Sequence, residues 1–210
     1  MNSENYYKMI IDGELVESET KKYISIEEPS TKKHFAYVPR GNYKDVEKAI
    51  ISSSKAFMNW SHIIPRDRGK LLAKIADEIE KNVEELSTII AKETGNAIRT
   101  QARPEANLVV DIFRYFGGLG GELKGETIPL GENNLCYTRR EPIGVVGAII
   151  PWNAPVMLGA LKIAPAICAG NTIVLKAAED APLGILFISK ICQKFLPKGV
   201  LNLLTGTGPE

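Results

Sequence analysis

The residues best suited to chemistry lie around Asn153, in the run Pro151-Trp152-Asn153-Ala154-Pro155. Residues 143–150 before it are all apolar or glycine, which predicts a strand covered on both faces. Pro151 ends that strand, and Pro155 suits the first turn of a helix, where its missing N–H would be unpaired anyway. Asn153 therefore lies in a strand-to-helix turn, where open α/β sheets place their ligands. Its amide could donate to a developing oxyanion, or its side chain could serve as the N-cap of the helix.

The turn is predicted to belong to a parallel sheet. After the strand at 143–150, the pattern alternates through a helix at 154–169, a strand at 172–175, a helix at 182–195 and a strand at 200–204. This β-α-β-α-β order predicts right-handed crossovers between parallel strands. Because the chain ends six residues after the last strand, we expect the domain to be incomplete, with an apolar sheet face left uncovered.

The first 140 residues should hold two β-hairpins, an irregular β segment and four helices. Asp12-Gly13 between short apolar runs signals a hairpin, and residues 23–38 should form an irregular β segment broken by Pro29. Apolar stripes at helical spacing then predict four helices, the first with Val46, Ala49, Ile50, Phe57 and Trp60 on one face and Asn42 as a possible cap. Residues 126–140 indicate a second hairpin, which Pro129 keeps out of a central sheet, so we expect an arm.

The composition excludes several classes of function. The net charge is +1 with scattered basic residues, so no nucleic-acid partner is expected. No apolar run approaches the ~20 residues of a membrane span, and no membrane association is expected. Three widely spaced cysteines favour free thiols in a reducing cytoplasm, and no Cys/His spacing indicates a metal.

Five motifs in order carry a resemblance to a known family. They are Arg140-Glu-Pro-Ile-Gly-Val-Val-Gly147, Pro151-Trp-Asn-Ala-Pro155, Lys162-Ile-Ala-Pro-Ala166, Ala169-Gly-Asn171 and Val174-Leu-Lys-Ala-Ala-Glu179. With them the chain resembles, over nearly its whole length, the amino-terminal part of the NAD(P)-dependent aldehyde dehydrogenase superfamily. The resemblance implies an α/β fold with an incomplete, parallel Rossmann-like sheet, an N-terminal β-hairpin with helices, and a β-hairpin oligomerisation arm. It divides the chain into residues 1–122 (the N-terminal part of the cofactor-binding domain), 123–141 (the arm) and 142–210 (the Rossmann-like unit).

The resemblance also implies roles for named residues. Asn153 matches the family's oxyanion asparagine, which acts with a cysteine nucleophile on an aldehyde. Lys176 and Glu179 match residues that hold the adenosine ribose, and the acidic side chain favours NAD over NADP. Where the family usually has proline, this chain has Ala177. The cofactor's path is implied to run along Ile149, Ile150, Pro151, Trp152 and Asn153, with minor contact from the turn at 205–209.

Further residues of the helix after Asn153 are assigned in the same way. Lys162 matches a lysine given a charge-relay or structural role. Being nine residues beyond Asn153, it should face away from that side chain and pair with a carboxylate elsewhere. Asn153, Met157 and Leu161 should share one helix face. The implied aldehyde tunnel is lined by the aliphatic side chains of Leu108, Ala154, Met157 and Leu161, which suits an uncharged or flexible aldehyde rather than a betaine aldehyde.

Two hypotheses about function stay open. The chain is the N-terminal portion of an NAD-dependent aldehyde dehydrogenase, a dimer or tetramer of identical subunits in the family. It would then be inactive alone, because the catalytic cysteine and glutamate belong to the family's downstream part. Alternatively, it is a non-catalytic nucleotide-binding or interaction module made as a short chain.

Overall fold

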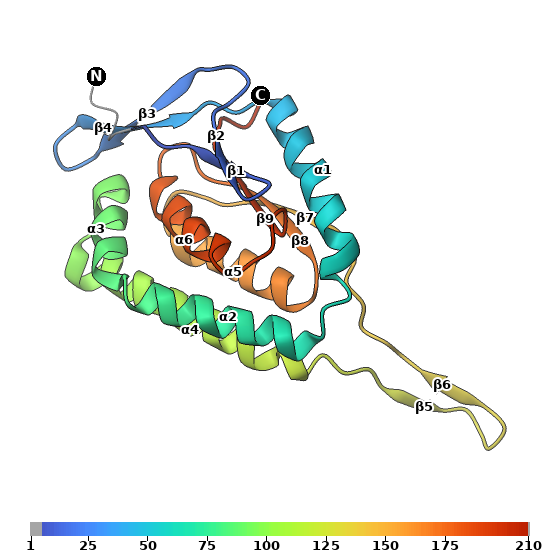
Figure 1. The fold of residues 1–210 in the computed structure, drawn as a ribbon. Helices are drawn as coiled ribbons and strands as arrows, with labels where there is room; N and C mark the ends of the chain where they lie inside the picture. The colour runs from blue at the N-terminus through green and yellow to red at the C-terminus, as the bar shows by residue number, and fades with distance from the viewer. Residues whose placement is uncertain (1–5, 210) are drawn as a thin grey trace.

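A five-stranded sheet forms the centre of the protein. In the computed structural model, which describes residues 6–209, the strand order is β2-β1-β9-β8-β7. Strands β7 (Val145–Ile149), β8 (Thr172–Lys176) and β9 (Leu201–Leu204) run parallel. Helices α5 (Pro155–Cys168) and α6 (Leu183–Gln193) connect them and cover one face of the sheet (Figure 1). The predicted α/β fold with its β-α-β-α-β order is confirmed.

The N-terminal hairpin completes one side of this sheet. Strands β1 (Met9–Ile11) and β2 (Glu14–Val16) are joined by Asp12-Gly13, both with positive φ, as a tight hairpin requires. β1 also pairs antiparallel with β9, with Ile10 opposite Leu203. The backbone N–H of Asp12 donates to the buried Asn202 Oδ1 at 2.7 Å. The hairpin was predicted, but its insertion beside the last strand of the chain was not.

A separate ribbon of two strands follows the hairpin. β3 (Tyr23–Glu28) and β4 (Lys33–Pro39) pair antiparallel, with a register shift after Ile26 and with Pro29 in the connecting turn. This agrees with the irregular β segment predicted for residues 23–38.

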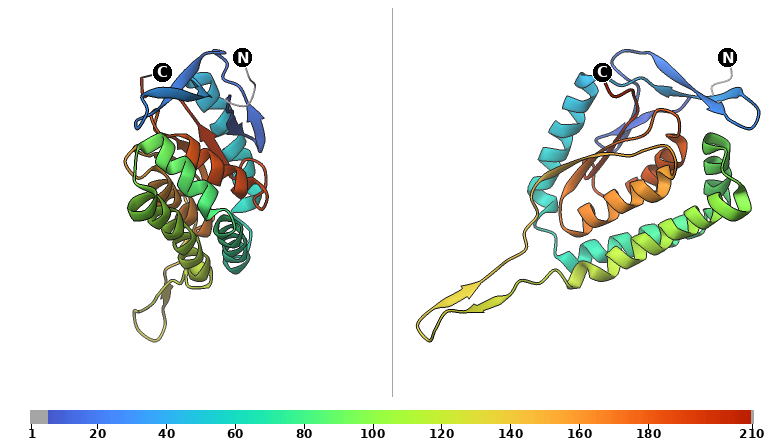
Figure 2. Two further views of the ribbon diagram at one scale, coloured as in Figure 1. Left: turned by 90° about the vertical axis from the view of Figure 1, so that its left-hand side faces the viewer. Right: turned by 180° about the vertical axis from the view of Figure 1, so that it is seen from behind.

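Helix α1 (Tyr43–Trp60) lies on the face of the sheet opposite α5 and α6 (Figures 1 and 2). Asn42 caps it as predicted, within a capping box that Asp45 completes. Ala49 and Trp60 are buried as expected. Val46 and Ile50 are not, with 40% and 45% of their surface exposed, because they face a cleft rather than closed core.

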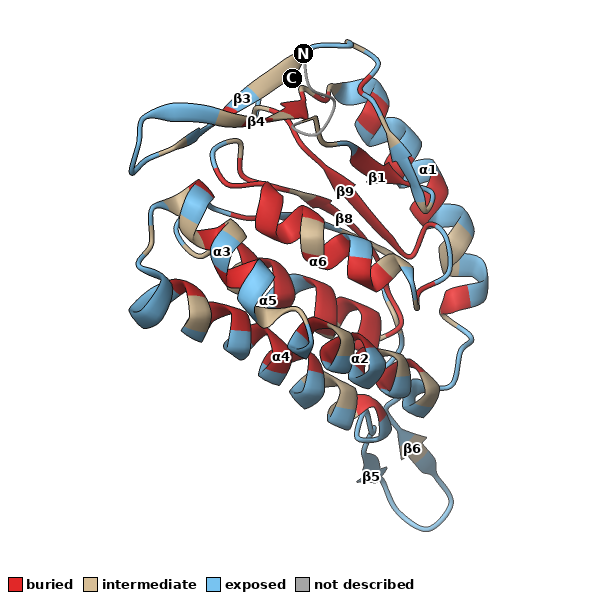
Figure 3. Ribbon diagram, turned by 60° about the vertical axis from the view of Figure 1, so that its left-hand side comes forward, coloured by how far each residue is buried: buried red, intermediate tan, exposed pale blue. Residues whose placement is uncertain are grey.

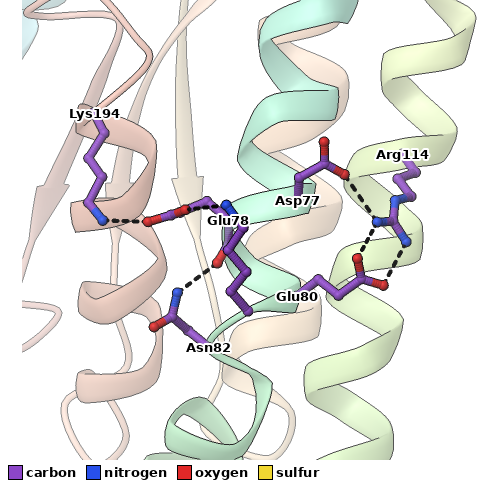
Figure 4. Close-up of polar contacts among 7 residues, drawn as sticks. Asp77, Glu78, Glu80, Asn82, Arg114 and Lys194 are labelled. Atoms are coloured by element: carbon purple, nitrogen blue, oxygen red, sulfur yellow. Dashed lines mark hydrogen bonds and ion pairs between the residues drawn. The ribbon is translucent and has the colours of Figure 1, made fainter.

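Three further helices form an outer layer behind α5 and α6: α2 (Pro65–Glu80), α3 (Val83–Thr94) and α4 (Arg103–Gly118). Figure 3 shows that their buried residues face the sheet side of the layer. Arg114 on α4 joins Asp77 and Glu80 on α2, and on the opposite side of α2 Lys194, at the end of α6, joins Glu78 (Figure 4). These exposed pairs contribute little to stability, because water and salt screen the attraction between surface charges.

A close approach of backbones joins α2 to the end of α4. A Cβ built on Gly69 would lie 2.3 Å from the carbonyl oxygen of Gly117, and backbone cannot move aside as a side chain can. We expect Gly69→Ala to lower the free energy of unfolding by roughly 2 kcal/mol. Gly118→Ala is the matched control: a Cβ there meets nothing within 4 Å. Chemical denaturation of both variants checks this prediction. Equal free energies of unfolding for the two variants would show that α2 and α4 can move apart without loss of stability.

The second hairpin is an arm that projects from the body (Figures 1 and 2). Strands β5 (Thr127–Pro129) and β6 (Leu135–Tyr137) pair only with each other among the described residues. Nearly all their side chains are exposed, with Leu135 at 82%. The arm expected from the sequence is therefore present, and its role in assembly stays a prediction.

The strand before Asn153 differs from its prediction. β7 covers residues 145–149 rather than 143–150, and it is not covered on both faces. Ile143 is 88% exposed and Ile149 is 77% exposed. Within residues 6–209, β7 pairs only with β8, and the face turned away from α5 opens onto the cleft beside α1. The unbroken apolar run at 143–150 therefore does not mean that both faces of the strand are buried, because part of its apolar surface lines the cleft.

Candidate functional site

A cleft of about 540 Å³ lies between α1 and the sheet, toward the carboxyl ends of the parallel strands. Its floor is apolar and comes from β7, β8 and β9, while its rim is polar. Open α/β sheets bind ligands at this end of their strands. Among the residues that line the cleft are Val46, Ile149, Lys176, Thr205, Gly206 and Gly208.

Lys176 and Glu179 form an ion pair beside the cleft. The Lys176 Nζ lies 2.8 Å from the Glu179 Oε2, and the lysine ends β8. The hydrogen bond from Lys176, aided by the glutamate's own backbone N–H, lowers the pKa of Glu179, so the carboxylate stays ionised. Glu179 is partly exposed and has lone pairs to spare. The pair can thus offer both a donor and an acceptor to a hydroxylated ligand.

The segment after β9 forms part of the cleft wall. Gly41 N–H donates to the Thr205 carbonyl at 3.0 Å, and Thr205 Oγ1 donates to the Pro39 carbonyl at 2.6 Å. Gly206 has φ +151°, and a Cβ there would lie 3.0 Å from the Gly41 carbonyl oxygen. Glycine lets the two backbones approach, so residues 205–208 face the cleft. Their predicted contact with a ligand is compatible with this position.

The turn at 151–154 is exposed and irregular. Pro151, Trp152 and Asn153 are all exposed, Trp152 at 61%. Helix α5 begins at Pro155, as predicted, but its N-cap is Ala154, which makes no side-chain hydrogen bond to the helix. The reading of Asn153 as an N-cap is therefore wrong. Within residues 6–209 its amide has no hydrogen-bond partner and so is available to a ligand.

A buried glutamate replaces the missing cap. Glu105 Oε1, from α4, accepts the backbone N–H groups of Val156 and Met157, both at 3.0 Å. Burial raises the pKa of Glu105, and these two hydrogen bonds oppose the rise. The first turn of α5 is thus held from another helix.

The helix-face prediction for Asn153 is wrong in one respect. Because α5 begins two residues after Asn153, only Met157 and Leu161 share a helical face. Lys162 follows on the next position and is exposed. It lines a hollow between α5 and β7, together with Val146. No carboxylate pairs with Lys162 in the part of the chain that the structure describes, contrary to expectation.

The remaining predicted residues divide into exposed and buried positions. Ile149 lines the cleft, whereas Ile150 is 3% exposed and its side chain reaches toward Gly159 in α5. Only the backbone of Ile150, and not its side chain, could therefore contact a cofactor. Of the tunnel candidates, Leu108 and Leu161 are 43% and 40% exposed, and Ala154 and Met157 are half-buried. Leu108 lies one turn beyond Glu105 on α4, close to the start of α5.

Neither helical cysteine is placed for nucleophilic chemistry. Cys168 and Cys192 are buried, and burial raises the pKa of both thiols. A thiol needs a lowered pKa to act as a nucleophile at neutral pH. Among residues 6–209, no cluster of three or more His, Cys, Asp or Glu could hold a metal, and no helix is long and apolar enough to span a bilayer.

Sequence reasoning missed two contributions to the site. Helix α1 lines the cleft through Asn42, Asp45, Val46 and Ile50, and Glu105 holds the turn. The only sequence signal that α1 could line a cleft was the spacing of Val46 and Ile50, and this spacing is equally typical of residues in a closed core. Nothing in the sequence around Glu105 pointed to a helix 51 residues away.

A parallel β-α-β-α-β unit with a cleft at its strand ends is the architecture of doubly wound nucleotide-binding proteins. The sequence profile described as "Aldehyde dehydrogenase family" matches residues 15–210. The chain belongs to the aldehyde dehydrogenase family.

Individual relatives support this assignment. The long-chain-aldehyde dehydrogenase of Acinetobacter sp. is 38% identical over 204 residues, covering 97% of this chain and 41% of that protein. Retinaldehyde dehydrogenase 3 of Mus musculus is 36% identical, covering 97% and 41%. The NAD+ complex of aldehyde dehydrogenase from Bacillus cereus superposes with a TM-score of 0.95 at 35% identity, covering 99% of this chain and 43% of that one. The chain therefore spans less than half the length of these relatives.

Proposed function

We propose that this chain is the N-terminal portion of an NAD-dependent aldehyde dehydrogenase that oxidises an aldehyde to a carboxylic acid. The observation that carries the proposal is the position of Asn153: an exposed amide with no partner among the described residues, in the turn beside the cleft-lining strand β7. Such a donor can stabilise the oxyanion that forms when an aldehyde carbonyl is attacked.

The cleft fits a dinucleotide. Its apolar floor can receive a flat ring system, and glycines at 206 and 208 leave the backbone accessible for close approach. Lys176 and Glu179 would hold ribose hydroxyls, the lysine donating and the carboxylate accepting. An ionised Glu179 would repel a 2′-phosphate, which favours NAD over NADP. Bound NAD would supply the hydride acceptor, while the chain's own residues bind and orient it.

The nucleophile is proposed to come from the remaining part of the enzyme. Burial raises the pKa of the two helical thiols, and Cys136 lies in β6 of the projecting arm, which contributes no residue to the cleft lining. Residues 1–210 alone should therefore bind the cofactor without turnover. Lys162 is proposed as a structural residue rather than a proton relay.

The substrate and assembly follow from the exposed surfaces. Leu108, Ala154, Met157 and Leu161 offer only aliphatic surface, which suits an uncharged aldehyde. The exposed arm is proposed to pair identical subunits into a dimer or tetramer. The free thiols support a cytoplasmic location.

The test is the rate of cofactor reduction in the presence of an aldehyde, measured once with NAD and once with NADP. The protein of full family length that contains these 210 residues should reduce NAD in the presence of an aliphatic aldehyde, and NADP more slowly. Glu179→Gln should weaken NAD binding about tenfold, because it replaces a hydrogen bond to a charged acceptor, worth roughly 1.5–3 kcal/mol, with a neutral one, worth about 0.5–1.5 kcal/mol. The preference for NAD over NADP should become smaller.

Two results would contradict the proposal. Nucleotide binding without aldehyde-dependent reduction in the full-length protein would instead indicate a non-catalytic nucleotide-binding module. Turnover by residues 1–210 alone would show that the chain holds its own nucleophile.

A further inference from the structure

The start of α5 lacks the usual local means of fixing a helix N-terminus. Its N-cap, Ala154, has no side chain that can accept a hydrogen bond, and Pro155 has no N–H to donate. The next two N–H groups, of Val156 and Met157, both point to Glu105 Oε1 at 3.0 Å. One carboxylate oxygen thus caps the N-terminus of α5, although its residue lies 51 positions away in the sequence.

This arrangement is stiff. Glu105 is only 8% exposed, and the helix that carries it is anchored by the fully buried side chains of Ala106 and Val109, which follow Glu105. A carboxylate at a helix N-terminus is favoured by the helix dipole as well as by the hydrogen bonds. The first turn of α5 therefore cannot shift without breaking two hydrogen bonds to Glu105 or moving α4.

The same contact leaves Asn153 free. An asparagine two residues before a helix could itself turn to cap the N–H groups, and its amide would then be committed. Because Glu105 already satisfies them, the Asn153 side chain stays available. We propose that Glu105 is a positioning residue, which fixes the turn of Asn153 by capping α5. This role rests on the function proposed above for Asn153.

Glu93 provides an internal comparison. It lies on α3, and its two carboxylate oxygens accept the N–H groups of Leu183 and Gly184 at the start of α6, at 2.5 and 2.9 Å. It is also buried, at 3% exposure. Both glutamates thus accept backbone N–H groups at the start of a neighbouring helix, but only Glu105 holds the helix that follows Asn153.

A double-variant cycle in the full-length enzyme tests the role. Glu105→Ala should lower kcat by about 10²-fold, since a misplacement of about 1 Å can cost that much, with the dissociation constant for NAD little changed. Glu105→Gln keeps an acceptor oxygen and should recover most of kcat. If Glu105 acts through Asn153, Glu105→Ala/Asn153→Ala should be no slower than Asn153→Ala alone. Glu93→Ala combined with Asn153→Ala should show multiplying effects.

Multiplying effects for Glu105→Ala and Asn153→Ala would overturn the proposal, as would an unchanged kcat in Glu105→Ala. If Glu105→Ala does not fold, Glu105→Asp replaces it, because it keeps the charge but retracts the oxygen by one methylene. Amide hydrogen exchange at Val156 and Met157 in residues 1–210 adds a readout without turnover: faster exchange in the variant supports the cap, and unchanged exchange overturns it. An inactive wild-type enzyme would sink the proposed function, while this exchange measurement would still decide whether Glu105 holds the turn.

Discussion

Replacing Asn153 with alanine in the full-length enzyme should lower kcat by about 10²–10³-fold, the usual cost of removing one oxyanion donor. NAD binding should stay near normal, because the proposed ribose contacts come from Lys176 and Glu179 on a different strand and loop. Steady-state kinetics with an aliphatic aldehyde, together with titration of NAD by calorimetry, separates the two effects.

The matched control for that variant is Asn107→Ala. Asn107 is an exposed asparagine on α4 that bonds only to the Arg103 carbonyl of its own helix among the described residues. It should leave kcat unchanged. Much weaker NAD binding or a lower melting temperature in Asn153→Ala would instead assign Asn153 a structural role.

Stability should fall as the pH rises through neutrality, and Glu93 is the main cause. Burial raises the pKa of Glu93 from 4.5 to about 8, against the two backbone hydrogen bonds, which favour the ionised form. Between these two values the unfolded chain has released the proton and the folded chain has kept it. The free energy of unfolding therefore decreases with pH in this window, by at most about 1.4 kcal/mol per pH unit, and levels off above pH 8.

Denaturation of residues 1–210 between pH 5 and 9 measures this slope. Glu93→Gln cannot ionise but keeps one acceptor oxygen, so its curve should be flatter over the same range. Burial also raises the pKa of Glu105, so the free energy of unfolding of Glu93→Gln should still decrease with pH, but less steeply than that of the wild type. A wild-type protein that gains stability from pH 5 to 8 would show that Glu93 is ionised in the fold.

The order of the elements could be predicted from the sequence because each carried a local signal. Asn42 marked the start of α1, and the structure shows it there as the N-cap. Asp12-Gly13 marked the first hairpin in the same way. Such signals need no knowledge of what the element packs against.

Burial was harder to predict, because it depends on neighbours that a local pattern does not describe. Ile149 and Val46 have the residue types and spacing of core positions, yet both face the cleft. Asn153 was placed correctly in the strand-to-helix turn, but a helical wheel could not show that α5 begins two residues later.

The polar contacts that shape the site were beyond local reasoning for a related reason. In the sequence, Glu105 is one charged residue on an amphipathic helix. Its partners are backbone N–H groups, which nearly every residue has, so no residue type identifies them. Lys162 shows the opposite error: a carboxylate was expected for it, but the lysine lies exposed beside β7.

The pairing of β1 with β9 has a consequence for how the chain folds as it is made. Asp12 and its partner Asn202 are 190 residues apart, so the first strand leaves the ribosome long before its neighbour exists. At ~5–20 residues per second, that interval is roughly 10–40 s. During it Met9, Ile10 and Ile11, all buried in the finished sheet, have no strand β9 to pack beside. The helices α2, α3 and α4 pack on one another through contacts closer in sequence, so they can form before β9 joins β1.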